Sequence, residues 1–597
     1  MLRGKAFDVR VEGVQTDADS AAVFTVRIGE AAPRALEASR DGQVYLRDAE
    51  VASTGSISVE LLRNGQVVAQ AGMHVIPGWV SIIPPLIAIA AALILRQVIP
   101  ALFLGLVVGA WVAKGMGFTA LWTGLLDTFQ VYVLAALIDP GHGAIILFSL
   151  MIGGMVGIIS RNGGMQDIVE RIVRRTRSPR KAQLATWVLG LLVFFDDYAN
   201  TLVVGNTMRS VTDRFKVSRE KLAYIVDSTA APVACLALVT TWIGYEVGLI
   251  GAAIENLDGF TESAYSVFLQ SIPYSFYPIL AILFVFCVAS SDRDFGPMYR
   301  AEQRARLTGQ VSSPNAEIVQ DEGESAAIAP KAGVKYRAMD AVLPIVVLVV
   351  SVLGGLYVTG EGDTLRDIIG TADSYGALMW GSLLGVITAV ALSLGRRTLS
   401  LSETVNAWFA GVKSMLLACV ILVLAWALSE ITTVIYTADY LISVLGDSLP
   451  PGIVPLLIFV LAALTAFSTG SSWGAMGILM PLVIPLVWAI LEINGLTGGD
   501  HHHILYSSVA CVLTGAVCGD HCSPISDTTI LSSMASGCDH IDHVRTQLPY
   551  ALFVGVVAML LGILPAGFGM PWWIGMAIGG GVLFFGLRIF GRSIPEA

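Results

Sequence analysis

Four oxygen-bearing side chains stand close together in a stretch of sequence that is otherwise apolar: Asp196, Asp197, Asn200 and Thr201. A Na⁺ ion leaving water needs several oxygen ligands and at least one negative charge, because burying an ion alone is too costly. Adjacent carboxyl groups also couple as they titrate, so such a pair can hold a cation when ionised and a proton when the cation is absent. The stretch therefore has the residue types for cation binding that competes with proton binding.

The surrounding run, 182–208, is typical of a helical hairpin that enters a membrane and returns to the same side. It contains 27 residues and no Lys or Arg, whereas one crossing requires about 20 residues and two require about 40. Both flanks carry the Lys and Arg of cytoplasmic loops. We therefore expect Asp196 and Asp197 at a re-entrant tip, where charged groups are costly and usually functional.

Three other apolar segments are interrupted by polar residues, and these supply the remaining candidates. They lie in a broken helix within 222–250, at the tip of a second hairpin near 467–474, and in a second broken helix near 519–529. The candidate ligands for Na⁺ are Asp196, Asp197, Asn200 and Asp227. The further candidates for ion or proton binding are Ser228, Thr229, Ser468, Thr469, Ser472, Asp520, His521, Ser523, Ser526, Asp527 and Thr528.

Each of these groups also has a purely structural interpretation. One of the paired aspartates, or Asp227, would then cap a helix, and the serines and threonines would satisfy the backbone of a turn. His521 is the only histidine that we expect in the core. The spacing of Cys518 and Cys522 around it matches no usual zinc site, so no cofactor is expected apart from the transported ions.

Composition excludes several classes of protein. The chain of 597 residues is 55% apolar and only 14% charged, with a mean hydropathy of +0.72, which indicates a polytopic α-helical membrane protein and excludes a soluble enzyme. The net charge of −10 gives no reason to expect nucleic-acid binding. Neither a P-loop nor His-Glu-x-x-His occurs, so the sequence predicts neither ATP hydrolysis, nor an associated ATPase subunit, nor an intramembrane metalloprotease.

The chain divides into four parts: a β-rich, sandwich-like domain over 1–78, a transmembrane repeat over 79–290, a cytoplasmic linker over 291–337, and an inverted repeat with a final span over 338–597. Each repeat contains three spans, a hairpin, a broken helix and one more span, which gives about 11 spans. Paired interruptions of this kind indicate the binding site of an inverted-repeat transporter. The expected simple spans are 81–95, 98–112, 144–159, 266–290, 341–358, 377–394, 415–428, 548–564 and 573–589, with amphipathic interfacial segments at 118–138 and 400–410.

The charge pattern predicts the orientation. Residues 251–265 carry acids and no Lys or Arg, whereas Arg588 and Arg592 follow the last span, so the C-terminus is expected inside and the N-terminal domain outside. No apolar segment suited to export follows Met1, and we expect a signal peptide upstream.

Three motifs carry a resemblance to a known family: Phe194–Thr201, Asp227–Pro232 and Gly519–Thr529. Together they resemble the NhaC family of bacterial sodium/proton antiporters, in the ion transporter superfamily, and the resemblance covers roughly 80–590. It implies an inverted-repeat fold in the bacterial inner membrane, usually dimeric, in which an elevator-like movement carries the ion. The family also contains malate/lactate antiporters and amino-acid carriers.

The sequence thus predicts a secondary antiporter that exchanges Na⁺ for H⁺. The first alternative is a Na⁺- or H⁺-coupled carrier of a small carboxylate or amino acid in the same fold. Because no basic residue occurs in either hairpin tip or either helix break, an organic anion is less favoured, although a helix N-terminus can hold a carboxylate. The alternative from a different class is a channel, which would not need two opposed broken-helix sites.

Overall fold

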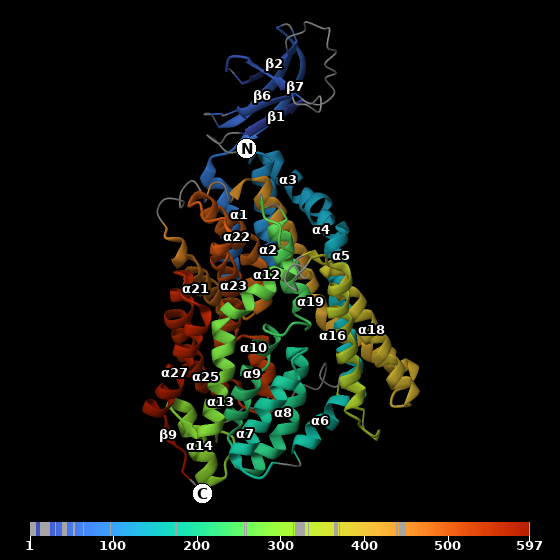
Figure 1. The fold of residues 1–597 in the computed structure, drawn as a ribbon, viewed down its shortest axis with the longest axis vertical. Helices are drawn as coiled ribbons and strands as arrows, with labels where there is room; N and C mark the ends of the chain where they lie inside the picture. The colour runs from blue at the N-terminus through green and yellow to red at the C-terminus, as the bar shows by residue number, and fades with distance from the viewer. Residues whose placement is uncertain are drawn as a thin grey trace.

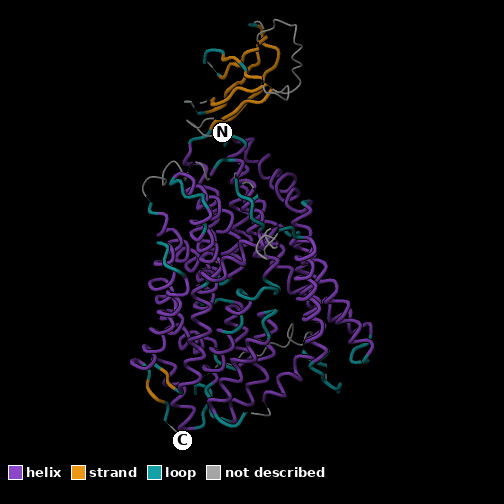
Figure 2. Tube along the Cα trace, in the orientation of Figure 1, coloured by secondary structure: helices purple, strands orange, loops and turns teal. Residues whose placement is uncertain are grey.

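A helical body forms most of the molecule, and a small strand-rich domain projects from one end (Figure 1). The computed structural model describes residues 7–595 apart from 12–23, 30, 39–43, 50, 52–53, 64, 96, 174–175, 256, 258, 315, 317–328, 332, 363–367, 369–370, 438–439 and 441–448. The described strands lie in the N-terminal domain and in one short pair near the C-terminus (Figure 2). The predicted fold class, an all-α polytopic body after a β-rich domain, is confirmed.

The N-terminal domain consists of two antiparallel sheets that share a small core. The sheets have the orders β1-β5-β4 and β3-β2-β6-β7, and Val26 of one is buried with Leu46 of the other, as in a small sandwich. Gly65, with a φ of 81°, allows the tight turn between β6 and β7. The strands are β1 (Phe7–Val11), β2 (Phe24–Ile28), β3 (Arg34–Ala35), β4 (Glu37–Ala38), β5 (Val44–Ala49), β6 (Gly55–Arg63) and β7 (Gln66–Val75).

The helical body has two halves, joined by a connector that contains α14 (Gly296–Thr308). The first half contains η1 (Gly78–Ile82), α1 (Ile83–Leu95), α2 (Val98–Ala113), α3 (Phe118–Asp127), η2 (Thr128–Val133), α4 (Leu134–Ile138), α5 (Pro140–Arg161), α6 (Gly164–Val173), α7 (Pro179–Leu192), α8 (Asp197–Arg214), α9 (Arg219–Ser228), α10 (Ala231–Ala234), α11 (Ile243–Ile254), α12 (Ala264–Ser271), η3 (Ile272–Tyr274) and α13 (Phe276–Ser291). The second contains α16 (Met339–Thr359), α18 (Ser374–Gly395), α19 (Leu401–Val434), η4 (Pro451–Ile453), α21 (Val454–Thr469), α22 (Ser472–Ile493), η5 (Gly499–His501), α23 (His503–Cys522), α24 (Asp527–Ser536), α25 (His540–Val557), η6 (Ala558–Ile563), α26 (Leu564–Gly567) and α27 (Trp572–Phe590). β8 (Arg293–Asp294) pairs with β9 (Arg592–Ser593).

Ten described helices are long and apolar enough to cross a membrane, or eleven if the bent pair Ala264–Tyr274 and Phe276–Ser291 counts as one span. The spans expected at 81–95 and 98–112 form helices of only 13 and 16 residues, less than the about 20 that a crossing requires. The segment 118–138, expected at the interface, is instead long and apolar enough to cross. Its amphipathic pattern shows that the helix has a more polar face, but it does not show whether that face lies against water or against other helices.

The first hairpin, α7 and α8, extends a few residues beyond the predicted 182–208 at each end. α7 begins after the N-cap Ser178, whose hydroxyl accepts a hydrogen bond from Lys181 N at 3.2 Å, and it ends at Leu192 just before the aspartate pair. Neither α7 nor α8 is among the candidate spans, and both lie at the end of the molecule that carries the C-terminus (Figure 1). In the second hairpin, by contrast, α21 and α22 each belong to a segment long enough to cross, so length alone does not make that hairpin re-entrant.

Both broken helices are present, and glycines let their parts pack closely. α9, α10 and α11 form the first, and α23 and α24 form the second, broken over 523–526. α8 packs against α24, and α21 against α23. A Cβ added at Gly205 would lie 2.7 Å from Ala535 Cβ, and one added at Gly519 would lie 2.1 Å from Ala463 O. The two halves therefore meet with their breaks side by side.

The connector between the halves is bound to the helical body at several points. In α14, Arg304 pairs with Glu220 of α9 at 2.9 Å, and Glu302 accepts a hydrogen bond from the Ser218 hydroxyl at 2.7 Å. Burial is the main cause that raises the pKa of Glu302 to about 7. Farther along, Lys331 pairs with Glu403 at 2.7 Å. The linker expected over 291–337 thus contains an ordered helix and a fixed end; 317–328 lie outside the described residues.

Candidate functional site

Two helix N-termini meet at the centre of the body, one from each half. α8 begins at Asp197 after the N-cap Asp196, and α24 begins at Asp527 after the N-cap Ser526. Asp196 accepts a hydrogen bond from Ala199 N at 2.6 Å, as expected for a cap. Each helix thus places a carboxyl group at its first position, where the helix dipole favours negative charge.

Asp197 stands out because nothing binds its carboxyl group. Its side chain is buried, with 1% of its surface exposed, and neither oxygen has a hydrogen-bond partner within the described residues. Asp196, Asp527 and the Trp242 indole lie near it. An ionised carboxylate in such surroundings needs a cation, and without one it is stable only when protonated.

The second half supplies two further carboxyl groups. Tyr198 OH donates a hydrogen bond of 2.5 Å to Asp527 Oδ2, which ties α8 to α24. Thr528 Oγ1 donates to Asp520 Oδ2 at 2.9 Å across the break in the second helix, while Asp520 Oδ1 has no partner in the described chain. Asp197, Asp520 and Asp527 all act electrostatically on Tyr198, so three acids from the two halves surround this side chain.

Asn200 holds the hairpin tip together. Its amide nitrogen donates to three carbonyl oxygens: Gly190 O at 2.7 Å, Val193 O at 3.2 Å and Thr229 O at 2.8 Å. Its Oδ1 is buried and unpartnered among the described groups. The predicted neighbour Thr201 bonds to Asp197 O at 2.9 Å, which is backbone support within its own helix. Asn200 thus joins both arms of the hairpin to the first broken helix.

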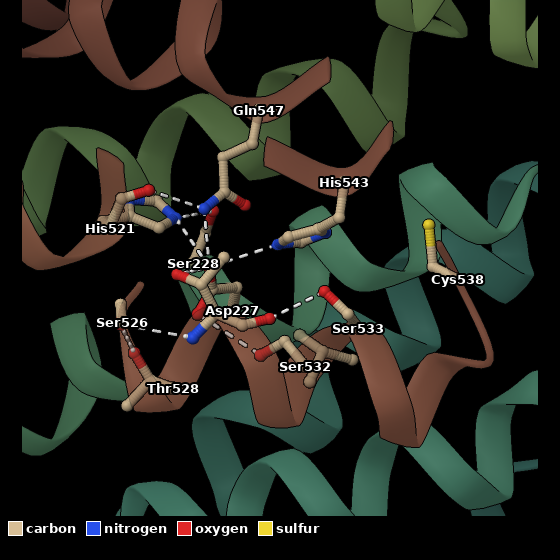
Figure 3. A network of polar contacts seen from close by, with 12 residues as sticks. Asp227, Ser228, His521, Ser526, Thr528, Ser532, Ser533, Cys538, His543 and Gln547 are labelled. Atoms are coloured by element: carbon tan, nitrogen blue, oxygen red, sulfur yellow. Dashed lines mark hydrogen bonds and ion pairs between the residues drawn. The ribbon is translucent and has the colours of Figure 1, made fainter. Parts of the chain in front are cut away.

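Asp227 lies in a separate network, in which both of its carboxylate oxygens accept hydrogen bonds (Figure 3). Oδ2 accepts hydrogen bonds from Gln547 at 2.5 Å and Thr529 at 3.2 Å, and Oδ1 accepts one from Ser532 at 3.3 Å. His543 Nε2 lies 3.3 Å from Oδ2. Since these partners come from α24 and α25, Asp227 holds the second half to the first broken helix.

His521 connects this network to the first half. Its Nε2 lies 3.0 Å from the hydroxyl of Ser228, its Nδ1 lies 2.8 Å from the hydroxyl of Tyr277, and its ring is 3.9 Å from Asp227. The other candidate in the first break, Thr229, bonds to Ile225 O at 2.8 Å within α9. Ser228 and His521 are therefore brought together, whereas Thr229 supports its own helix.

The candidates at the second hairpin tip mainly bond to the backbone. Thr469 Oγ1 donates to Thr465 O at 2.9 Å, Ser468 is half-buried and Ser472 is buried. Ser523 donates to Phe467 O at 2.7 Å, which binds the second broken helix to this tip. Ser526 accepts from Thr529 N at 3.3 Å as the N-cap of α24.

Several residues of this site were not among the sequence candidates. His543 is fully buried, which corrects the expectation that His521 is the only core histidine, and Gln547 lies one turn farther along α25. His543 lies within a largely polar run, 539–545, that is typical of a solvated helix start, and Gln547 follows it. The signal that could have found them is their spacing, because positions 543, 547 and 550 lie on one helical face and all three are buried.

The four proposed Na⁺ ligands do not form one cluster. Asp227 is engaged with α24 and α25, Asp196 caps α8, and the free oxygens belong to Asp197 and Asn200. Among the residues that the structure describes, no group of three or more His, Cys, Asp or Glu side chains could hold a metal ion. The arrangement present offers single carboxylates and carbonyl-type oxygens near two helix breaks.

The chain is similar to known transport proteins. A family model described as "Na+/H+ antiporter family" matches residues 233–567. A protein of Haemophilus influenzae described as uncharacterized is 33% identical over 82% of this chain and 91% of its own length. The arginine/ornithine antiporter ArcD of Halobacterium salinarum is 43% identical over 54 residues, 9% of this chain and 11% of its own.

Two solved structures are also similar. The YdaH transporter of Alcanivorax borkumensis aligns over 75% of this chain and 90% of its own, with 16% identity and a TM-score of 0.47. MtrF of Neisseria gonorrhoeae, described as one of a class of antimetabolite efflux pumps, aligns over 79% of this chain and 87% of its own, with 12% identity and a TM-score of 0.37.

Proposed function

We propose that this chain, which belongs to the Na⁺/H⁺ antiporter family, exchanges Na⁺ for H⁺ across a membrane as a secondary active antiporter. The chain is a multi-pass membrane transporter by family and by its candidate spans. The observation that supports the ion specificity is the carboxyl group of Asp197, buried and unpartnered among the described residues.

This carboxyl group supplies the coupling. In its ionised form it binds Na⁺, because a buried negative charge requires a cation nearby. When Na⁺ leaves, the same carboxylate takes up a proton, because Asp196 and Asp527 lie close to it and like charges in a low-dielectric site do not all stay ionised. Occupation by one ion therefore excludes the other, which is the requirement for exchange.

A carrier of a small amino acid or carboxylate is the second candidate. Two helix N-termini point toward the site, which favours an anion, and 54 residues match an arginine/ornithine antiporter. However, Asp197 and Asp527 already occupy the first positions of these helices. Their negative charge favours a cation over an organic anion.

The wider arrangement follows from charge and packing. We place the protein in the bacterial inner membrane, with the C-terminus and the basic ends of α7 and α8 inside and the N-terminal domain at the opposite, outer end (Figure 1). α5, α16, α18 and α19 pack on one another and would serve as a scaffold. The hairpin-bearing helices would move against this scaffold as an elevator, in a homodimer surrounded by lipid.

Purified protein in proteoliposomes tests the function. Na⁺ added outside the vesicles should make the lumen more alkaline, because Na⁺ enters while H⁺ leaves. Na⁺ loaded inside should have the opposite effect, and neither response should require amino acids, malate or lactate. Radiolabelled arginine, ornithine, malate and lactate, added with and without Na⁺, provide the comparison. A proton signal that appears only with one organic solute would support the carrier instead.

Competition at one carboxylate also predicts a pH dependence. Apparent Na⁺ affinity should fall about tenfold per pH unit, or more steeply, on the acid side of the pH at which the site protonates, because each Na⁺ must displace at least the proton on Asp197. Li⁺ and K⁺ should be measured in parallel. An affinity that does not change with pH would separate Na⁺ binding from proton binding.

A further inference from the structure

A second buried carboxyl group, that of Glu246, lies close to the candidate site. Glu246 is in the first turn of α11, and its N–H donates to Trp242 O at 2.9 Å. It therefore follows, by about one helical turn, the residue whose indole lies beside Asp197. The break before α11 is bound to the first hairpin tip, because Thr241 N donates to Phe195 O at 2.9 Å. Glu246 therefore belongs to the element that contacts the hairpin tip.

The side-chain donor that lies against this carboxyl group, within the described part of the protein, is the weakly donating thiol of Cys235. Glu246 has no exposed surface, and both of its oxygens lack a hydrogen-bond partner. α5, α12, α19 and α22 pack against α11. Tyr245 of α11, Tyr265 of α12 and His142 of α5 each bond to a backbone oxygen elsewhere. The other titratable groups on the four packed helices do not act on Glu246, whose neighbour in this respect is Cys235; they are Arg161, Glu403, Lys413, Cys419, Glu430 and Glu492.

In these surroundings the carboxyl group of Glu246 is protonated and therefore neutral. An isolated ionised carboxylate in an apolar environment is so unfavourable that the group binds a proton instead. The neighbouring segment 235–242 lies between α10 and α11 and is not helical. Backbone of this kind within a membrane can line a water-filled cavity, which gives a buried carboxyl group a route for protons.

We propose that Glu246 binds and releases a second proton in each transport cycle, so that two protons exchange for one Na⁺. This inference rests on the proposed Na⁺/H⁺ exchange. Asp197 exchanges one proton for one Na⁺ and moves no net charge. The additional proton, taken up by Glu246 on one side and released from the same carboxyl group on the other, makes the complete cycle move one net positive charge.

Opposing gradients across proteoliposomes measure the ratio. At zero membrane potential, a tenfold H⁺ gradient should balance about a hundredfold Na⁺ gradient in the wild type, and about a tenfold gradient in Glu246→Gln. An imposed potential should drive wild-type exchange and should not drive the variant. Cys235→Ala, which changes the neighbour and leaves the carboxyl group intact, should keep the wild-type ratio.

The outcomes separate this inference from the proposed function. If the wild type shows no Na⁺-dependent proton movement, Na⁺/H⁺ exchange itself is wrong. If the wild type exchanges and Glu246→Gln has the same ratio and voltage dependence, Glu246 carries no proton. A wild-type ratio of one also overturns the inference.

An inactive Glu246→Gln variant is resolved by two measurements. Recovery of exchange by Glu246→Asp would show that a titratable group is required. If Glu246→Asp is inactive as well, the wild-type protein is labelled with dicyclohexylcarbodiimide, which attacks protonated carboxyl groups. The pH dependence of this labelling then tests whether Glu246 exchanges its proton. Labelling of Glu246 that declines between about pH 5 and about pH 9 supports a cycling proton, and constant labelling contradicts it.

Discussion

We expect the replacement of Asp197 with Asn to abolish Na⁺-driven proton movement, and the same replacement at Asp196 to leave exchange intact. Asp197 provides the unpartnered charge, and without it a buried Na⁺ loses about 3 kcal/mol or more, over a hundredfold in affinity. Asp196 caps α8 through Ala199 N, and Asn is an equally good cap. The readout is the initial rate of luminal pH change in proteoliposomes.

Asp196→Asn and Asp197→Asn serve as controls for each other in tests of folding. Both are isosteric, both lie at the same helix start, and both should give the same gel-filtration profile and melting temperature as the wild type. Equal loss of activity in the two variants would assign coupling to the pair as a unit. Full activity of Asp197→Asn would move the coupling site to Asp520 or Asp527, whose carboxyl groups act on the same Tyr198.

We expect the replacement of Asp227 with Ala to abolish transport and to lower the stability of the protein strongly. The change removes the acceptor for the buried donors Thr529, Ser532 and Gln547 and the charge beside His543. Removing one partner of a buried charged network costs about 3–5 kcal/mol. The apparent melting temperature in detergent should therefore fall by several degrees, and little protein should reach the membrane.

A neighbouring serine provides the matched control. The hydroxyl of Ser533 bonds to Thr529 O at 2.8 Å and not to Asp227, so Ser533→Ala should retain most of the stability and transport. Asp227→Asn keeps an acceptor for Ser532 but directs an amide toward the Gln547 amide, and it should be intermediate in stability. A stable, folded Asp227→Ala protein that lacks only Na⁺ binding would make Asp227 a ligand after all.

The architecture could be predicted from the sequence because its signals are local. Apolar runs, basic flanks and polar interruptions occur within short windows, and they indicate the first hairpin and both broken helices with nearly the observed bounds. The lengths of the helices at 81–95 and 98–112 could not be predicted, because hydropathy does not reveal that they end after 13 and 16 residues.

The division of roles within the site depends on details that a single sequence does not contain. Asp196 and Asp197 are identical in type, and a helix that began one residue earlier would exchange their roles. The partners of Asp227 are equally hidden, because His543 and Gln547 are 316 and 320 residues away along the chain. Glu246 lies in a run whose sequence indicates only an apolar helix. That its carboxyl oxygens lack hydrogen-bond partners among the described residues is seen only in the three-dimensional structure.

Counting the protons released when Na⁺ binds tests the central claim most directly. Purified protein in weakly buffered detergent, held at a pH where the site is protonated, should release one proton from Asp197 for each Na⁺ bound, since both compete for one carboxylate. A second proton should be released with it in the wild type, and not in Glu246→Gln, when Glu246 discharges in the same step. Asp196→Asn should release the same amount and Asp197→Asn none. Saturable Na⁺ binding by the wild type without proton release would contradict the account.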